Sequence, residues 1–220
     1  MTHAITGFFK GEGFHNYLKS LRYSLYTMRR PLDGFWDLIH EKRGSMAAAH
    51  TLVVLAAIIQ ILRYVLTNFQ FMPINMEFFS AYFVVLQTVV PILLWTIANW
   101  CLTTLFDGKG KMSHIYMGIA YALTPMIIVN AALIPVSHMI TLDEGAFYWI
   151  LLSFSTLWFV VLLLCAMKEI HDYSFAKTII TSLITIFAIG VLLFIFMMFF
   201  AVVSDGIVYF FSIYQELAYR

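Results

Sequence analysis

Long runs of apolar residues separated by short polar stretches dominate this chain of 220 residues. Five of the runs are long enough to cross a hydrocarbon core of about 30 Å, which takes about 20 helical residues. Backbone groups inside lipid have no water to bond, so each span must be an α-helix. The pattern therefore predicts an all-α, polytopic membrane protein. Its five spans are placed near residues 46–66, 78–105, 115–136, 147–167 and 179–203.

Composition supports the same class of protein. Hydrophobic residues make up 62% of the chain and charged residues 11%, whereas soluble domains have about 45–50% and about 25%. Eleven of the thirteen basic residues fall before the first span or in the loops after the second and fourth spans. By the positive-inside rule, this bias predicts an amino terminus inside and a carboxyl terminus outside. We expect the apolar tail, residues 204–220, to form a separate helix along the extracytoplasmic surface.

The segment before the first span, residues 1–45, is predicted to be cytoplasmic. Apolar residues recur in it at spacings of four, three, four and three, which places them on one face of a helix. Arg22 and Arg29 lie off that face and are candidate contacts for anionic lipid or for a partner protein. Such a helix either lies on the inner leaflet or packs on the cytoplasmic ends of the spans, and the pattern leaves both open. The apolar positions are Phe14, Leu18, Leu21, Leu25 and Met28.

Polar residues inside the spans are candidates for function because lipid makes them costly. His50, Asn99 and Asn130 are the candidates here. Hydrogen bonds between such groups on neighbouring helices contribute about 0.6–2 kcal/mol, and we interpret the three residues mainly as packing contacts. Prolines inside the second and third spans predict kinks, which keep a transporter or channel as the alternative hypothesis.

A search for reactive chemistry is mostly negative. The HExxH pattern and the phosphate-binding GxxxxGK[ST] pattern are both absent from the sequence. His171 and Asp172 stand beside lysines without a third ligand at metal-site spacing, which favours a solvated loop. We therefore predict a protein that is not an enzyme, with no cofactor, no metal site and no nucleic-acid partner.

Two short motifs surround the start of the third span. Asp107-Gly108-Lys109-Gly110-Lys111 closes the second span, and Tyr121-Ala122-Leu123-Thr124-Pro125 follows within the third. This pairing resembles the Yip-domain membrane proteins, named after Ypt-interacting proteins. Residues 31–45 look like the entry sequence of bacterial members, typically from Firmicutes, and the resemblance covers residues 31–203.

The resemblance implies a five-span membrane domain in the bacterial cytoplasmic membrane. In it, Gly108 and Gly110 are turn residues, and Tyr121 and Pro125 are packing residues of the third helix. Eukaryotic relatives bind small prenylated GTPases and shape membranes, but bacteria lack that machinery. Bacterial relatives resemble accessory proteins, some associated with ABC-type transporters.

The functional hypothesis that follows is a non-enzymatic accessory or scaffold protein. Its expected partners are anionic lipids of the inner leaflet and another membrane complex or a second copy of itself, with membrane shaping as a related role. Lys109 and Lys111 are further candidate contacts because lysines in a cytoplasmic turn attract anionic headgroups. A small solute transporter or channel remains the alternative.

Overall fold

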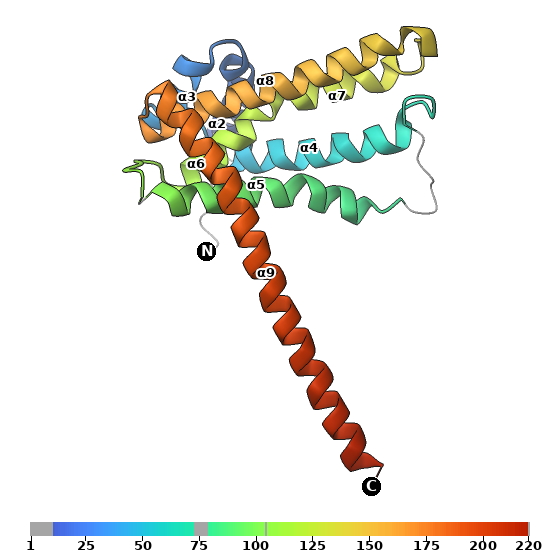
Figure 1. Cartoon of the computed structure of the whole chain (residues 1–220). Coiled ribbons are helices and arrows are strands. Elements are labelled where there is room, and N and C mark those ends of the chain that lie inside the picture. Colours follow the sequence, from blue (N-terminus) through green and yellow to red (C-terminus); the bar gives the residue numbers. More distant parts are fainter. Residues whose placement is uncertain (1–10, 73–78, 104, 220) are drawn as a thin grey trace.

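The computed structural model describes residues 11–72, 79–103 and 105–219, and these residues form an all-α protein (Figure 1). Five stretches are long and apolar enough to cross a membrane, which confirms the five predicted spans. The first predicted span matches its helix at both ends. The helices are α2 (Gly11–Arg29), α3 (Pro31–His40), α4 (Met46–Leu66), α5 (Ala81–Thr103), α6 (Met112–Ala122), α7 (Thr124–Val136), α8 (Gly145–His171) and α9 (Phe175–Ala218), with a short 3₁₀ helix at Leu142–Glu144.

Helices α4, α5, α7 and α8 run alongside one another and form the body of the molecule (Figure 1). Helices α2 and α3 lie at one end of this body, together with residues 105–111 and 172–174. The connections after α4 and α7 lie at the other end. The basic segments therefore lie at one end of the molecule. This agrees with the prediction that they lie on one side of the membrane. That this end faces the cytoplasm stays a prediction.

The third span is divided into α6 and α7 at Leu123. Pro125 lies in the first turn of α7 and has no N–H to donate to the carbonyl oxygen of Tyr121, four residues earlier. The hydroxyl of Thr124 donates to that oxygen instead, at 2.7 Å. The break predicted from proline thus occurs in the Tyr121–Pro125 motif, and a side chain replaces the missing backbone bond.

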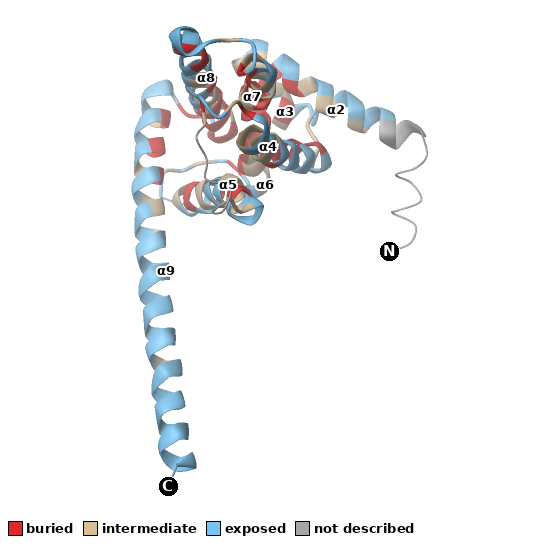
Figure 2. Cartoon of the chain, turned by 90° about the vertical axis from the view of Figure 1, so that its right-hand side faces the viewer, coloured by how far each residue is buried: buried red, intermediate tan, exposed pale blue. Residues whose placement is uncertain are grey.

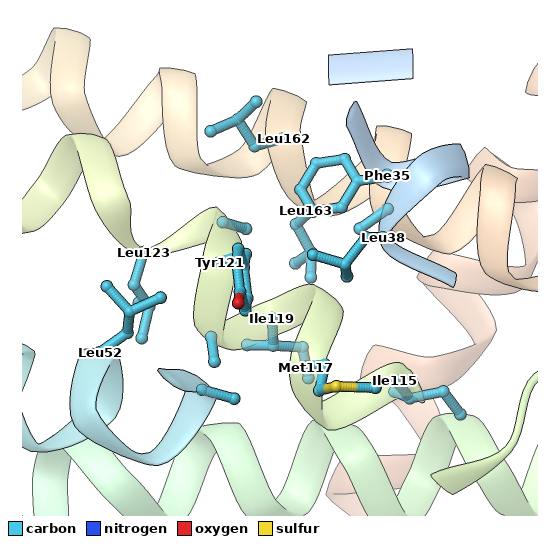
Figure 3. Close-up of a cluster of buried hydrophobic side chains, with 14 of the residues drawn as sticks. Phe35, Leu38, Leu52, Ile115, Met117, Ile119, Tyr121, Leu123, Leu162 and Leu163 are labelled. Carbon is cyan, nitrogen blue, oxygen red and sulfur yellow. The ribbon is translucent and has the colours of Figure 1, made fainter. Parts of the chain in front are cut away.

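The core lies where α6 meets α3, α4 and α8 (Figure 3). Tyr121 is fully buried there, beside Phe35 and Leu38 of α3 and Leu162 of α8. Close approach of α6 to α8 depends on Gly118, because a Cβ at this position would lie 2.6 Å from Ile170 Cδ1. The third span is therefore the central helix of the bundle.

Helices α2 and α3 pack on the bundle, which is one of the two alternatives for this segment, and contact of α2 with the inner leaflet stays a prediction. A Cβ on Gly34 would lie 2.8 Å from the Cα of Thr27, so α2 and α3 are in close contact. The apolar positions of α2 share one face, but the bundle covers only part of it. Leu21 and Met28 pack against the core, whereas Leu18 and Leu25 are each 45% exposed. Two small polar residues of α2, Ser24 and Thr27, are buried, and the backbone of α3 approaches α2 closely at Thr27. The side chain of Phe14 lies outside the described part of the structure.

Helix α9 is a single helix of 44 residues, so the separate tail helix expected at 204–220 is not present in the described residues. Residues Ser204–Gly206 contain no proline, and one glycine inside a helix costs only about 1 kcal/mol, so nothing there ends the helix. Only the first turns of α9 are buried, and the rest extends obliquely away from the bundle (Figure 2). The buried residues of α9 are Thr178, Thr181, Ser182 and Thr185.

Candidate functional site

The motif turn after α5 folds onto the connection between α8 and α9. Gly108 N–H donates to the carbonyl of Thr103 at 2.9 Å. The hydroxyl of Tyr173 donates to the carbonyl of Phe106 at 2.9 Å, and Lys109 Nζ lies 2.8 Å from Asp172 Oδ2. We call this contact of residues 105–111 with residues 171–173 the clasp.

The two motif glycines are required by close approach and not by an unusual backbone angle. No glycine in the described residues has a positive φ. A Cβ on Gly108 would lie 2.6 Å from His171 Nδ1, and one on Gly110 would lie 2.6 Å from His171 Cε1. The glycines therefore allow the turn backbone to lie directly on the His171 ring.

His171 is 3% exposed, so its interpretation as part of a solvated loop is wrong. Its Nε2 lies 2.7 Å from Asn99 Oδ1, and the N–H of Gly110 donates to its Nδ1 at 3.3 Å. Since the amide oxygen can only accept and the backbone N–H can only donate, these partners assign a neutral ring with the proton on Nε2. Both ring nitrogens have a partner, so burial leaves no polar atom of the ring without a hydrogen bond.

Asn99 connects the clasp to the membrane helices through hydrogen bonds. Its Nδ2 donates to Thr185 Oγ1 at 3.1 Å, and the Thr185 hydroxyl donates to the carbonyl of Thr181 at 2.8 Å. One chain of hydrogen bonds thus joins the turn, α8, α5 and α9. Interhelical bonds of this kind are favourable where water is absent.

Two lysines, Lys109 and Lys177, lie close to Asp172 and Tyr173 at the exposed edge of the clasp. A hydrogen bond from Lys109 lowers the pKa of the Asp172 carboxyl below its ordinary value. Burial raises the pKa of the Tyr173 hydroxyl, and Lys177 Nζ lies 4.3 Å from the centre of the Tyr173 ring. Both lysines of the turn are exposed; Lys109 forms an ion pair with Asp172, and in the described residues no ion pair is found for Lys111.

Tyr121, the other motif residue, connects three helices through its hydroxyl. It donates to the carbonyl of Ser20 in α2 at 3.1 Å and accepts from the N–H of Ser45 at the start of α4, at 3.4 Å. The ring itself is fully buried in α6. Tyr121 thus holds α2 against the membrane body, and Pro125 behind it is buried in the first turn of α7.

The other polar candidates lie apart from the clasp. His50 is exposed on α4, with its Nδ1 2.8 Å from the hydroxyl of Tyr116 in α6. Asn130 is 4% exposed, and its Oδ1 has no hydrogen-bond partner among the described residues. Arg22 and Arg29 are exposed on α2. The structure therefore brings together Asn99 and the motif turn but leaves His50, Asn130 and the α2 arginines separate.

Sequence reasoning missed His171, and only one weak signal was available. A histidine beside Asp172 and Lys168 has the composition of a solvated loop. Its burial follows from contact with Asn99, 72 positions earlier in the chain, which no local pattern shows. Two glycines in one turn were the signal, since glycine also marks close backbone approach.

The chemistry available to the clasp is hydrogen bonding and ion pairing between elements. In the part of the chain that the structure describes, no group of three or more His, Cys, Asp or Glu residues could hold a metal ion. Its residues join α5, α8 and α9 at the end of the bundle that carries the basic loops.

Comparison with known proteins identifies the family. The chain has no match among curated proteins and none among solved structures. A family model described as the Yip1 domain matches residues 25–198, from the second half of α2 into α9. This match covers the motif turn, the Tyr121–Pro125 motif and all of the clasp, and we conclude that the chain belongs to the Yip1 domain family of membrane proteins.

Proposed function

We propose that this chain is a non-enzymatic accessory protein of the bacterial cytoplasmic membrane that binds another membrane protein through distal α9, residues 186–218. The observation that carries the proposal is the exposure of α9. Its most apolar window has a mean hydropathy of 3.0, and none of that window is buried against the rest of the chain.

Length distinguishes distal α9 from an ordinary lipid-facing helix. At 1.5 Å per residue, its 44 residues extend about 66 Å, which is about twice the thickness of the hydrocarbon core. No charged residue lies between Lys177 and Asp205. That uncharged stretch alone is about 40 Å long, enough for one crossing. A span ending near Asp205 leaves the last turns of α9 beyond the hydrocarbon.

Those last turns remain apolar and aromatic. Phe210, Phe211 and Tyr214 are each more than 60% exposed. Aromatic side chains are enriched in protein interfaces, because they bury a large area at a small entropy cost. The family match ends at residue 198, so this part of α9 lies outside the shared domain. These features favour a protein surface as its cover, supplied by a partner complex such as a transporter.

Transport by the chain itself is less well supported. Asn99 is hydrogen-bonded to His171 and Thr185, as expected for a packing residue. Asn99 and Asn130 do not line the cavities of about 700, 480 and 580 Å³ in the described residues. The clasp likewise resembles a structural contact, which supports the non-enzymatic assignment.

Affinity purification of the tagged protein from native membranes in a mild detergent, with mass spectrometry, tests the proposal. We expect a stoichiometric membrane protein to accompany the wild-type chain. Replacing four phenylalanines of distal α9 by leucine preserves hydropathy but changes the shape of the surface, and should remove this partner. The four are Phe194, Phe196, Phe199 and Phe200.

A matched control carries Tyr82→Leu and Phe83→Leu on α5, two aromatic residues with about 70% exposure. The control should retain the partner. A solitary wild-type protein, or a partner retained by the α9 variant, would contradict the proposal. Solute flux through liposomes containing only the purified chain would instead support the transporter alternative.

A further inference from the structure

A cavity of about 700 Å³ opens between α2 and the segment that joins α3 to α4. Its wall includes Tyr17, Lys19, Ser20, Lys42, Arg43 and Ser45. A second cavity, of about 480 Å³, lies beside it and shares Lys19, Tyr23 and Arg43 with it. Sites for small molecules usually have volumes of about 300–1,000 Å³. We call the pair the α2 cavities.

The α2 cavities are strongly basic. Five basic residues line them, and the one acidic residue in their walls is Glu41. Arg43 is already engaged by ion pairs with both Glu41 and Asp37. In the described part of the chain, the other four basic side chains have no acidic partner within ion-pair distance. These four are Lys19, Arg22, Arg29 and Lys42.

The start of α4 adds to the positive potential of the larger cavity. Ser45 is the N-cap of this helix, and its hydroxyl accepts from the N–H of Ala48 at 3.1 Å. Ser45 and Ala47 both line the cavity, so the positive end of the α4 dipole faces it. Basic side chains and a helix N-terminus together favour an anionic group such as a phosphate.

The backbone at Lys42 gives a further indication. Its φ is 52°, in the left-handed region, just after the end of α3. Glycine is the usual residue at such a position, because a Cβ there comes close to the following carbonyl oxygen. Here a lysine occupies the position and adds its charge to the cavity wall.

The smaller cavity has an apolar wall, which distinguishes a lipid from a soluble phosphate compound. Leu25, Tyr26 and Tyr23 line it beside the arginines. Leu18 and Leu25 are also the exposed apolar residues of α2, and the first membrane helix begins at this end of the molecule. An acyl chain would lie against this wall while the headgroup meets the basic residues.

We propose that the α2 cavities bind the phosphate headgroup of an anionic phospholipid from the adjoining leaflet. Lys19 and Lys42 contact the phosphate, Arg22 and Arg29 hold the outer edge of the headgroup, and Leu25 and Tyr26 contact the first part of an acyl chain. Because α2 is held by Tyr121, the bound lipid would also strengthen the contact of α2 with α4.

Native mass spectrometry of the purified full-length chain in a neutral detergent tests this site, with phosphatidylglycerol and phosphatidylcholine as probes. We expect one phosphatidylglycerol per chain, in clear preference to phosphatidylcholine. Each basic residue near a membrane surface contributes about 1 kcal/mol, or about fivefold in affinity. The double variant Lys19→Gln/Lys42→Gln should therefore bind phosphatidylglycerol about 25-fold more weakly.

The control Lys111→Gln/Lys177→Gln removes the same charge from residues that line neither cavity. Its affinity should change less than twofold. An equal loss in both double variants would indicate a general surface attraction and would overturn the proposal. Equal binding of phosphatidylcholine would do the same.

Two further measurements keep the test decisive. Lys42→Gly removes the charge and relieves the left-handed strain. Its melting temperature should be equal to or higher than that of the wild type, while its affinity for phosphatidylglycerol falls about fivefold. Unchanged affinity would contradict the assignment of Lys42.

Inorganic phosphate and glycerol 3-phosphate at millimolar concentration should not displace the lipid. Displacement by either would assign the cavities to a soluble phosphate compound and would overturn the lipid proposal.

Discussion

The third and fifth membrane helices show opposite relations between hydropathy and burial. The most apolar window of Met112–Val136 has a mean hydropathy of 1.9, and 56% of it is buried. That of α9 has a mean hydropathy of 3.0, and 0% of it is buried. The more hydrophobic helix is therefore the one that the rest of the chain leaves exposed, as Figure 2 shows.

The contrast between the two helices arises because the solvent around them is lipid and not water. Lipid tails are as apolar as leucine, so hydropathy does not drive helices together inside a bilayer. Small residues and interhelical hydrogen bonds do so instead. Gly118 and Ala120 allow α6 to approach its neighbours, and the buried start of α9 carries a stripe of threonine and serine. Hydropathy identifies the spans, and these smaller features decide which spans pack.

The largest predicted effect is overpacking at Gly118. In Gly118→Val, the new side chain would meet Ile170 and Ala166, at 2.6 and 3.2 Å from the Cβ position. Overpacking of this kind typically lowers stability by about 1–3 kcal/mol. Gly190→Val on α9 is the matched control, because no atom lies within 4 Å of its Cβ position. Thermal unfolding in detergent should show a large loss for the first variant and almost none for the second. Similar losses would remove the contrast between the helices.

An intermediate effect is predicted for the buried polar chain. Asn99→Leu deprives His171 Nε2 and Thr185 Oγ1 of their shared partner. The expected loss in unfolding free energy is about 1–2 kcal/mol. Gln87→Leu makes a similar exchange at an exposed position of the same helix and should be neutral or slightly stabilising. If Gln87→Leu were as damaging as Asn99→Leu, the hydrogen bonds at Asn99 would not be what joins α5 to α8 and α9.

The smallest effect concerns pH at the exposed edge of the clasp. Lys109 holds the pKa of Asp172 below its ordinary value, so the folded state binds fewer protons than the unfolded state. The resulting stabilisation is present above the ordinary aspartate pKa, near pH 4, and is lost as pH falls through the lowered value. Asp172→Asn, which tolerates the left-handed backbone of this residue, should therefore lose less melting temperature than wild type between pH 5 and pH 3.

The control for this variant is Asp205→Asn on α9, where the described residues provide no ion-pair partner. It should retain the pH dependence of the wild type. The same reduction in both variants would show that net charge, and not the Lys109–Asp172 pair, sets the acid sensitivity.

Much of the membrane architecture was predictable because a span has a local signature. The bounds of α4 follow from a single apolar run that starts at a serine N-cap. The break in the third span follows from Pro125, since a proline inside a helix removes a known hydrogen bond. Such features depend on residues close together in the chain.

The packing was less predictable because it depends on distant contacts. The apolar spacing of α2 did not show that Ser24 and Thr27 would be buried, because the contact of Thr27 with Gly34 depends on how α3 packs on α2. The apolar run predicted a span that ends at residue 203, but it did not show that the helix itself continues to Ala218. For the clasp, the sequence singled out residues 107–111 only through a short motif. Their contact with His171 could be seen only in the folded structure.

Site-specific photocrosslinking in native membranes tests most directly whether distal α9 is a docking surface. A photoreactive residue replaces Phe199 on α9 or, as a control, Phe83 on α5, which are similarly exposed at 66% and 71%. The account predicts a discrete protein adduct from position 199 and only lipid adducts from position 83. Lipid adducts alone at both positions, or an intrachain adduct of α9 with its own bundle, would contradict it.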